Sequence, residues 1–164
     1  MSNQELIGDM ICFVCELFDA NNIVYWIDFG TLLGIVREGD IIKWDSDGDI
    51  SIFKSSRESV IKVLTDQSKY KFRKAGGRYR ISPLDSSEPW IDIYIWKDNS
   101  IGEFYESAES GFPRGLYIKC EHIKQLCRLK FRNKAILAPK KYRSRLIQLY
   151  GDYMTPVKRV PYWR

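Results

Sequence analysis

The segment "WIDIYIW", residues 90–96, alternates along its whole length between isoleucine and a larger or charged side chain. Side chains two residues apart in a strand point to the same face of a sheet, so this period predicts a β-strand with one isoleucine face. Asp92 lies on the other face, among aromatic side chains. A buried carboxylate costs free energy unless it has a partner. Asp92 therefore either has a chemical role or belongs to an edge strand that faces water.

Patterns elsewhere in the chain predict helices and further strands around this one. Helices are expected at residues 3–20, after Gly30, at 55–67 and from Pro139 to Tyr150, and strands at 23–29, 49–54, 70–82 (a hairpin around Gly76-Gly77) and 134–139. Ser55 and Glu58 have the spacing of a capping box, and Thr31 is expected to cap the short helix. A polar loop is predicted at residues 97–115, and the pattern of residues 116–131 fits either a strand or a helix. The predicted fold is α+β, a small mixed sheet flanked by helices in a single domain over residues 1–164.

The composition fits a globular domain with a basic surface. The chain has 164 residues, of which 45% are hydrophobic and 29% charged, which is enough to bury one core. A formal net charge of +5 favours an anionic partner, although mildly basic small proteins are common. The first ten residues lack the basic and apolar order of a signal peptide, and no run approaches ~18 apolar residues. We therefore expect a cytoplasmic protein without a membrane span.

The four cysteines are expected to be free thiols in that compartment. Cys12 and Cys15 form a C-x-x-C, but they lie within the first predicted helix, whereas zinc ligands usually come as tight pairs on turns. Cys120, His122 and Cys127 could complete a zinc site, so structural zinc stays the alternative to ordinary thiols.

Three aspartates at every second position, Asp45, Asp47 and Asp49, lead into the predicted strand at 49–54. If the strand begins near Asp47, then Asp47 and Asp49 project side by side from its start. Two carboxylates about 4 Å apart repel by about 4 kcal/mol at an effective dielectric constant near 20. A hydrated turn relieves that repulsion, and so does a divalent cation. Mg²⁺ binds one or two carboxylates and takes its other ligands from water and phosphate.

Two further features favour the cation over the hydrated turn. Asp92, on a neighbouring strand, could complete a divalent site or accept the proton of an attacking hydroxyl. Upstream, Gly30 and Thr31 lie between a strand and a helix, where backbone N–H groups and a hydroxyl can bind phosphate. Arg37 can supply a charge to the same anion. A glycine turn, a D-x-D strand start and a third aspartate, in that order, are typical of nucleotidyltransferase-type phosphoryl transfer.

The stretch "YWIDFGTLLGIVREGDIIKWDSDGDISIF", residues 25–53, resembles the signature of the LicD family: an apolar strand, G-T-L-L-G-x-x-R, then W-D-x-D-x-D and an apolar run. "WIDIYIW" and "APKKYRSRLIQLYGDYMTPVKR" resemble the family's third-aspartate strand and its closing segment. The family includes phosphocholine transferases of bacterial surface glycans, fukutin and the fukutin-related protein. Lys43 and Gly48 depart from the pattern, since many relatives have proline and an apolar residue there.

The resemblance implies a nucleotidyltransferase-like fold and a transferase. The transferred group would be phosphocholine or an alditol phosphate, the donor a CDP-linked nucleotide diphosphate, and the acceptor a sugar hydroxyl of a glycan. By position, Asp47 and Asp49 would bind Mg²⁺, with Mn²⁺ as the alternative ion, and Asp92 would be the third acid. The implied donor-binding residues are Gly30, Thr31, Arg37 and Asp45. Further basic candidates for phosphate contacts are Arg78, Arg80, Lys140 and Lys141.

Three rival functions stay open. A D-x-D glycosyltransferase would bind a nucleotide sugar through Mn²⁺, although such folds generally need a longer segment before the D-x-D. A nucleotidyltransferase would attach a nucleoside monophosphate to RNA, a protein or a small molecule. A nucleic-acid-binding module would use the basic surface. Such a module has no need for three converging carboxylates, so we expect no nucleic-acid partner.

Overall fold

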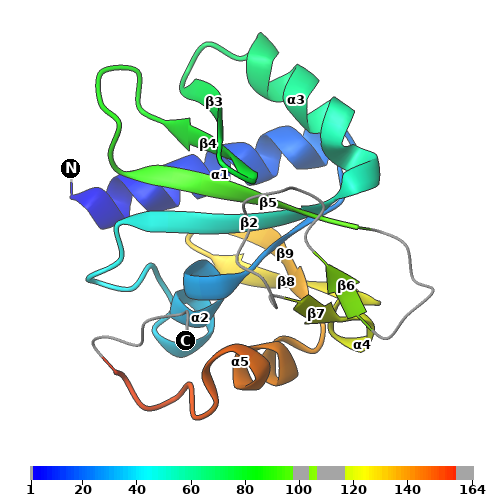
Figure 1. Ribbon diagram of the computed structural model, residues 1–164. Coiled ribbons are helices and arrows are strands. Elements are labelled where there is room, and N and C mark those ends of the chain that lie inside the picture. The colour runs from blue at the N-terminus through cyan, green and yellow to red at the C-terminus, as the bar shows by residue number, and fades with distance from the viewer. Residues whose placement is uncertain (1, 98–103, 107–116, 158–164) are drawn as a thin grey trace.

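The chain folds into helices and strands in mixed order, and the computed structural model describes them over residues 2–97, 104–106 and 117–157 (Figure 1). The helices are α1 (Asn3–Ala20), α2 (Phe29–Arg37), α3 (Arg57–Asp66), α4 (Cys120–Ile123) and α5 (Tyr142–Tyr150), with a short 3-10 helix, η1 (Lys54–Ser56), before α3. The strands are β1 (Tyr25–Ile27), β2 (Asp47–Phe53), β3 (Lys71–Ala75), β4 (Arg78–Ser82), β5 (Trp90–Trp96), β6 (Phe104–Glu106), β7 (Tyr117–Lys119), β8 (Leu126–Phe131) and β9 (Lys134–Pro139).

Five strands form one mixed sheet in the order β1-β2-β5-β4-β3, with β2 and β5 paired in parallel at its centre. The other neighbours in this sheet pair antiparallel, and β6–β7 and β8–β9 form two small sheets of their own. Asp49 of β2 lies opposite Asp92 of β5, which in turn lies opposite Arg80 of β4. The register of three strands therefore lines up two acids and a base on one face of the sheet.

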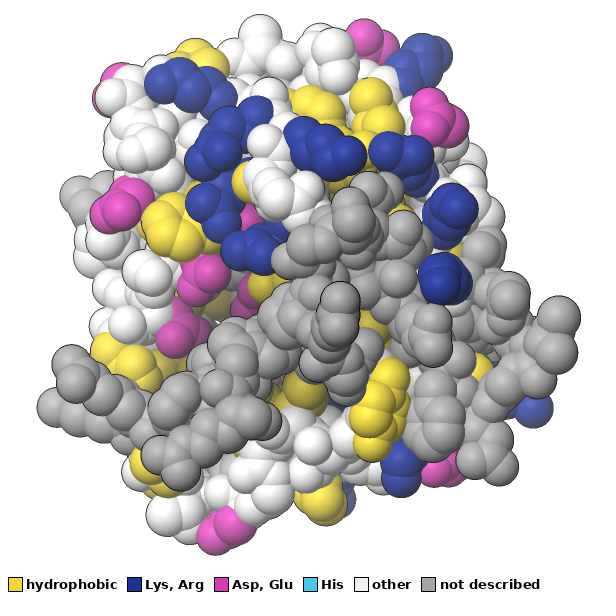
Figure 2. Space-filling model, viewed as in Figure 1, with side chains coloured by type: hydrophobic (Ala, Val, Ile, Leu, Met, Phe, Trp, Pro, Cys, Tyr) yellow, Lys and Arg dark blue, Asp and Glu magenta, His cyan; other side chains and the backbone are white. Residues whose placement is uncertain are grey.

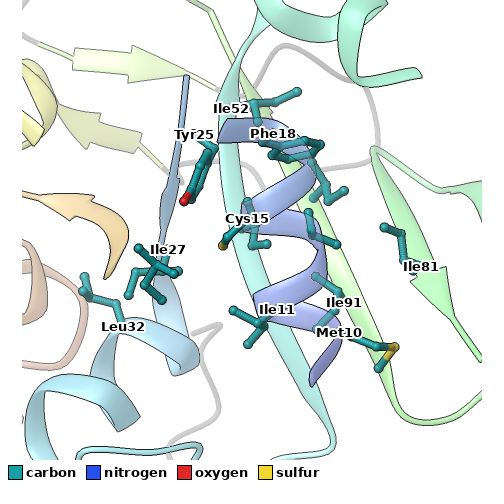
Figure 3. Close-up of a cluster of buried hydrophobic side chains, with 14 of the residues drawn as sticks. Met10, Ile11, Cys15, Phe18, Tyr25, Ile27, Leu32, Ile52, Ile81 and Ile91 are labelled. Atoms are coloured by element: carbon teal, nitrogen blue, oxygen red, sulfur yellow. The ribbon is translucent and has the colours of Figure 1, made fainter. Parts of the chain in front are cut away.

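α1 covers the opposite face of this sheet and supplies much of the apolar core (Figure 3). The buried side chains that meet there are Met10, Ile11, Cys15 and Phe18 from the helix and Ile52, Ile81 and Ile91 from the sheet. Burying each such side chain contributes about 1.5–3 kcal/mol. A Cβ on Gly48 would lie 2.6 Å from Cδ1 of Ile91 and 3.0 Å from Cδ1 of Ile11. Gly48, one of the two departures from the family pattern, thus lets α1 approach β2.

The sheet has a second, more polar face, on the side of α2 and α5. The side chains of this face are Asp47, Asp49 and Ser51 from β2, Trp90, Asp92, Tyr94 and Trp96 from β5, and Arg78 and Arg80 from β4. A smaller apolar cluster closes one part of it: Trp26, Phe29, Trp96, Ile118 and Ile123. α2 and α5 contact each other beside that cluster. The two faces are therefore chemically distinct, one apolar and covered by α1, the other rich in acids and bases.

The predicted α+β fold with a small mixed sheet flanked by helices is confirmed, but three predicted helix starts are wrong. Ser55 makes no capping box, because it lies within η1 and α3 begins only after it. Asp28 rather than Thr31 caps α2, since its carboxylate accepts from the backbone N–H of Phe29. Pro139 belongs to β9, where it pairs with Leu126, and α5 begins at Tyr142.

The segment 116–131, which fitted either a strand or a helix, contains both, as β7, α4 and β8. The predicted polar loop at 97–115 lies mostly outside the described residues. In the part of the chain that the structure describes, no helix combines the length and the apolar character needed to cross a membrane.

Candidate active site

Asp45, Asp47 and Asp49 form an acidic cluster at the start of β2, on the polar face of the sheet. Three hydrogen bonds fix the position of Asp49. The backbone N–H of Gly30 donates to its Oδ2 (3.1 Å), and the hydroxyl of Tyr94 donates to its Oδ1 (3.1 Å). Its own backbone N–H donates to Oγ1 of Thr31 (2.8 Å). The N-terminal turn of α2 therefore holds a carboxylate and places a partial positive charge beside it. The predicted phosphate contacts of Gly30 and Thr31 stay predictions.

Gly30 lies against two carboxylates at once. A Cβ at this position would lie 2.8 Å from Oδ2 of Asp45 and 3.4 Å from Oδ2 of Asp49. The second glycine of G-T-L-L-G, Gly34, has a different neighbour, since a Cβ there would lie 2.6 Å from the backbone oxygen of Asp40. The first glycine makes room for the acidic cluster, whereas the second makes room for the loop that leads to it.

Burial and mutual repulsion raise the pKa values of the three aspartates in "WDSDGD". Burial, and then the charge of Asp47, raises the pKa of Asp45 to about 6. Burial, and then the charge of Asp92, raises the pKa of Asp47 to about 6. Burial, and then the charge of Asp47, raises the pKa of Asp49 well above its usual range. The fold leaves this negative charge incompletely neutralised, a condition that favours a bound cation.

Asp92, by contrast, is neutralised by two arginines of β4. Nε of Arg78 donates to Oδ2 (2.7 Å), and Arg80 donates from Nε to Oδ1 (2.7 Å) and from Nη2 to Oδ2 (3.0 Å). The indole N–H of Trp90 also donates to Oδ2 (3.3 Å). The alternative of a water-facing edge residue is wrong, because β5 lies between β2 and β4 and Asp92 is only 1% exposed.

The donor set fits a cation on Asp47 and Asp49. Both carboxylates lie at the start of β2 on one face, and Mg²⁺ commonly binds one or two carboxylates and completes its shell with water and phosphate. Across the described ranges, no three His, Cys, Asp or Glu side chains are arranged to hold a metal ion. Mg²⁺ or Mn²⁺ here stays a prediction, and so does Asp92 as a ligand.

Arg37 lies at the opposite end of α2 from Gly30. Its Nη2 donates to Oε1 of Glu38 (2.7 Å), and its Nη1 donates to the backbone oxygen of Tyr153 (3.2 Å). The charge of Arg37 also lowers the pKa of Asp45, but burial of Asp45 raises that pKa by more. Arg37 is therefore near the acidic cluster, but its guanidinium is engaged elsewhere, and the predicted phosphate contact stays a prediction.

The cysteines do not gather into a metal site among the described residues. All four are free thiols. Burial raises the pKa of the Cys15 thiol far above its usual range, which disfavours the thiolate that zinc requires. Within the same ranges, Cys120, His122 and Cys127 form no metal-binding group.

An ion pair that sequence reasoning missed holds the start of α2. Arg145 of α5 donates from Nε and Nη2 to the two carboxylate oxygens of Asp28 (3.0 and 3.1 Å), and both side chains are 0% exposed. Asp28 also caps α2, because its carboxylate accepts from the backbone N–H of Phe29. The φ of Phe29 is 46°, which is unfavourable for a residue with a side chain. Two signals were readable: an aspartate directly before a helix, and an arginine on the apolar face of α5, three residues after Tyr142.

Comparison with known families matches residues 22–141 to the nucleotidyltransferase domain described as LicD/FKTN/FKRP. The chain belongs to the LicD family. The matched range contains the whole acidic cluster and Asp28, whereas Arg145 lies beyond it.

Two curated proteins resemble this LicD chain along most of its length. An uncharacterised protein of Rickettsia typhi is 31% identical over 143 residues, which cover 84% of the chain and 39% of that protein. Human ribitol 5-phosphate transferase FKRP is 24% identical over 148 residues, which cover 85% of the chain and 30% of FKRP. The LicD chain thus spans less than half the length of either relative.

Solved structures show the fold. The lincosamide antibiotic adenylyltransferase LnuA, in a lincomycin-bound crystal structure, aligns with a TM-score of 0.60 at 17% identity, over 90% of this chain and 87% of LnuA. ANT(2")-Ia, in complex with adenylyl-2"-tobramycin, aligns with a TM-score of 0.56 at 13% identity, over 81% of this chain and 68% of that one. The predicted nucleotidyltransferase-like fold is therefore confirmed for this LicD protein.

Proposed function

We propose that the chain is a Mg²⁺-dependent phosphotransferase. It moves a phospho-head group, phosphocholine or an alditol phosphate, from a CDP-linked donor to a sugar hydroxyl of a glycan. The observation that carries the proposal is the acidic cluster at the start of β2, where burial and repulsion raise the pKa values of Asp45, Asp47 and Asp49 beside the N-terminus of α2. Family membership and the match to ribitol 5-phosphate transferase FKRP support transfer of a phosphorus-containing group.

Each acidic residue has a separate task in this reaction. Asp47 and Asp49 hold the cation, which when bound neutralises the donor pyrophosphate and the leaving nucleotide. The acceptor oxygen forms a bond to the β-phosphorus, the bond from that phosphorus to the bridging oxygen breaks, and CMP leaves with the bridging oxygen. Asp92 is the third acid and takes the proton of the hydroxyl. Gly30 and Tyr94 keep the Asp49 carboxylate in place through the reaction.

Product analysis distinguishes this function from its rivals. The chain is incubated with Mg²⁺, a panel of glycan acceptors, and CDP- and UDP-linked donors that carry a label on the β-phosphate. We expect the label to enter the acceptor as a phosphodiester while free CMP accumulates. In a parallel incubation with nucleoside triphosphates labelled on the α-phosphate, entry of that label into the product would indicate a nucleotidyltransferase instead. A glycosylated product without phosphate would indicate a glycosyltransferase.

Substitution of the two proposed cation ligands tests the residue assignment. Asp47→Asn and Asp49→Asn remove one charge each while keeping side-chain size, so Mg²⁺-dependent transfer is expected to disappear in both. Asp66→Asn, on the exposed last residue of α3, is the matched control and is expected to keep full activity. Wild-type transfer rates in both site variants would overturn the assignment.

A further inference from the structure

The Asp92 carboxylate has almost no acceptor capacity left. Four N–H groups, from Arg78, Arg80 and Trp90, donate to its two oxygens at 2.7–3.3 Å. An ionised carboxylate offers about four acceptor positions in all. A cation or an acceptor hydroxyl that needs Asp92 must therefore compete with the two arginines for the same oxygens.

The two arginines lie between the buried acid and the surface. The side chains of Arg78 and Arg80 are 30% and 15% exposed, whereas that of Asp92 is 1% exposed. Figure 2 shows Lys and Arg side chains gathered beside Asp and Glu side chains on this view of the molecule. The guanidinium groups are therefore accessible from the surface, whereas the carboxylate that they cover is not.

A guanidinium suits phosphate as well as it suits carboxylate. Its planar fork donates two parallel hydrogen bonds to either anion, and phosphate offers more charge. Arg78 and Arg80 belong to one strand and point to one face, so both can bind the same pyrophosphate. A divalent cation that approaches Asp92 also repels both arginines, which lowers the cost of moving them.

We propose that Arg78 and Arg80 are exchangeable counter-ions: they bind Asp92 in the ligand-free protein and move to the donor's phosphates when the cation arrives. The inference rests on the proposed function for the identity of the donor, and it deepens that function by naming the residues that bind the pyrophosphate. The oxygens of Asp92 that the arginines release then face the cation and the acceptor hydroxyl. Metal and pyrophosphate consequently bind cooperatively, each favouring the same arrangement of the arginines.

The exchange predicts effects of opposite sign on two ligands. Without Arg80, Asp92 is partly uncovered and a nearby positive charge is gone, so a divalent cation alone binds more tightly. Pyrophosphate loses a ligand, so it binds more weakly. An arginine that only stabilises the sheet would not tighten the binding of any ligand when it is removed.

The test measures two affinities in the full chain. Mn²⁺ alone is titrated by electron paramagnetic resonance, and inorganic pyrophosphate is titrated by calorimetry at saturating Mn²⁺, in the wild type, Arg78→Gln and Arg80→Gln. We expect the Kd for Mn²⁺ to fall and the Kd for pyrophosphate to rise, each by about tenfold, the usual scale of coupling between two sites. Arg128→Gln is the matched control, because Arg128 also donates twice to one aspartate, Asp19, but lies on β8; it is expected to change neither Kd.

A further variant keeps the test decisive if Arg80→Gln does not fold. Arg80→Lys retains the charge and loses the fork, so it is expected to leave the Mn²⁺ affinity near that of the wild type and to weaken pyrophosphate binding. Unchanged or weaker Mn²⁺ binding in a folded Arg78→Gln or Arg80→Gln variant overturns the exchange, and so does a failure of every variant to bind Mn²⁺. Pyrophosphate carries neither base nor head group. The opposite-sign response can therefore hold even where the donor panel shows no transfer, which separates this inference from the proposed function.

Discussion

Arg145 and Asp28 form a buried ion pair, which joins α5 to the N-cap residue of α2. Two hydrogen bonds of 3.0 and 3.1 Å connect them, and both side chains are 0% exposed. The guanidinium also lies over the rings of Phe29 and Trp96, 5.3 and 6.0 Å from their centroids. The pair thus supports the start of α2, where the backbone N–H of Gly30 donates to Asp49.

Removing the arginine of this pair is expected to cost much of the stability. Arg145→Met leaves the Asp28 carboxylate buried without its counter-ion, and breaking a buried pair in this way costs about 3–5 kcal/mol. Urea unfolding measures the change. Arg128→Met, which breaks a half-exposed pair with Asp19, should cost less than about 1 kcal/mol. Equal losses in the two variants would show that the buried pair has no special role.

The acidic cluster makes stability depend on pH in an unusual direction. The pKa values of Asp45 and Asp47 are about 6 in the folded protein and start from 3.8, so the folded state holds protons more tightly than the unfolded state. The stability linked to these groups is fully present below 3.8 and is lost as the pH rises through about 6. In a chelating buffer, we expect the free energy of unfolding to fall between about pH 4 and 7.

Two additions to that titration identify its cause. Asp47→Asn should flatten the decline and be more stable than the wild type at neutral pH, since the repelling charge is gone. Mg²⁺ should restore the wild type above pH 6, and should not affect Asp47→Asn to the same extent. A wild-type free energy of unfolding that rises over this interval would contradict the raised pKa values.

The two glycines of G-T-L-L-G should respond differently to alanine. In Gly30→Ala the new methyl meets the end of the Asp45 side chain, which can move, so the fold should survive. Displacing the groups around a metal ligand typically costs about 10–100-fold in metal affinity, so Mn²⁺ binding should weaken on that scale. Gly34→Ala meets the backbone of Asp40 instead and should lower stability. Urea unfolding and Mn²⁺ titration of both variants separate the two effects.

Tyr94 is expected to tune the Asp49 carboxylate. Tyr94→Phe removes a hydrogen bond to the ionised acid, which raises the pKa of Asp49 further and should shift the onset of Mn²⁺ binding to higher pH. The ring contact with Phe29, 4.7 Å between centroids, is retained, so the fold should not change. Tyr79→Phe is the matched control, because that hydroxyl accepts from Arg57 instead. A pH dependence identical to that of the wild type would exclude this role for Tyr94.

The strands of the central sheet could be predicted because their signal is local. Alternation in "WIDIYIW" and "DISIF" places Asp49 and Asp92 on one face without any knowledge of their partners. That Asp92 would be covered by Arg78 and Arg80 could not be predicted in the same way. The two arginines alternate within β4, but their partner depends on the register in which β4 pairs with β5. The residue pattern of β4 alone does not fix that register.

The roles of Asp28 and Arg145 could not be predicted for a different reason. Each residue had a local sequence signal, but that signal was ambiguous. Asp28 follows a strand and precedes a helix, yet Thr31 offered an equally acceptable cap. Arg145 has the spacing of a buried residue in α5, but an arginine at such a position is ordinarily exposed. Only the approach of α5 to the start of α2 makes each residue the partner of the other.

The two proposed cation ligands are held in place to different degrees, and this difference affects which ions the site would accept. Asp49 is fixed by α2 and Tyr94, whereas Asp47 is only half-buried at the first position of β2. Metal–oxygen distances are about 2.0–2.1 Å for Mg²⁺ and about 2.3–2.6 Å for Ca²⁺. If Asp49 stays fixed and Asp47 shifts, the site can accommodate both distances. We therefore expect the site to discriminate weakly between divalent ions by radius, so that the composition of the surrounding ion pool, rather than the protein, decides which ion is bound.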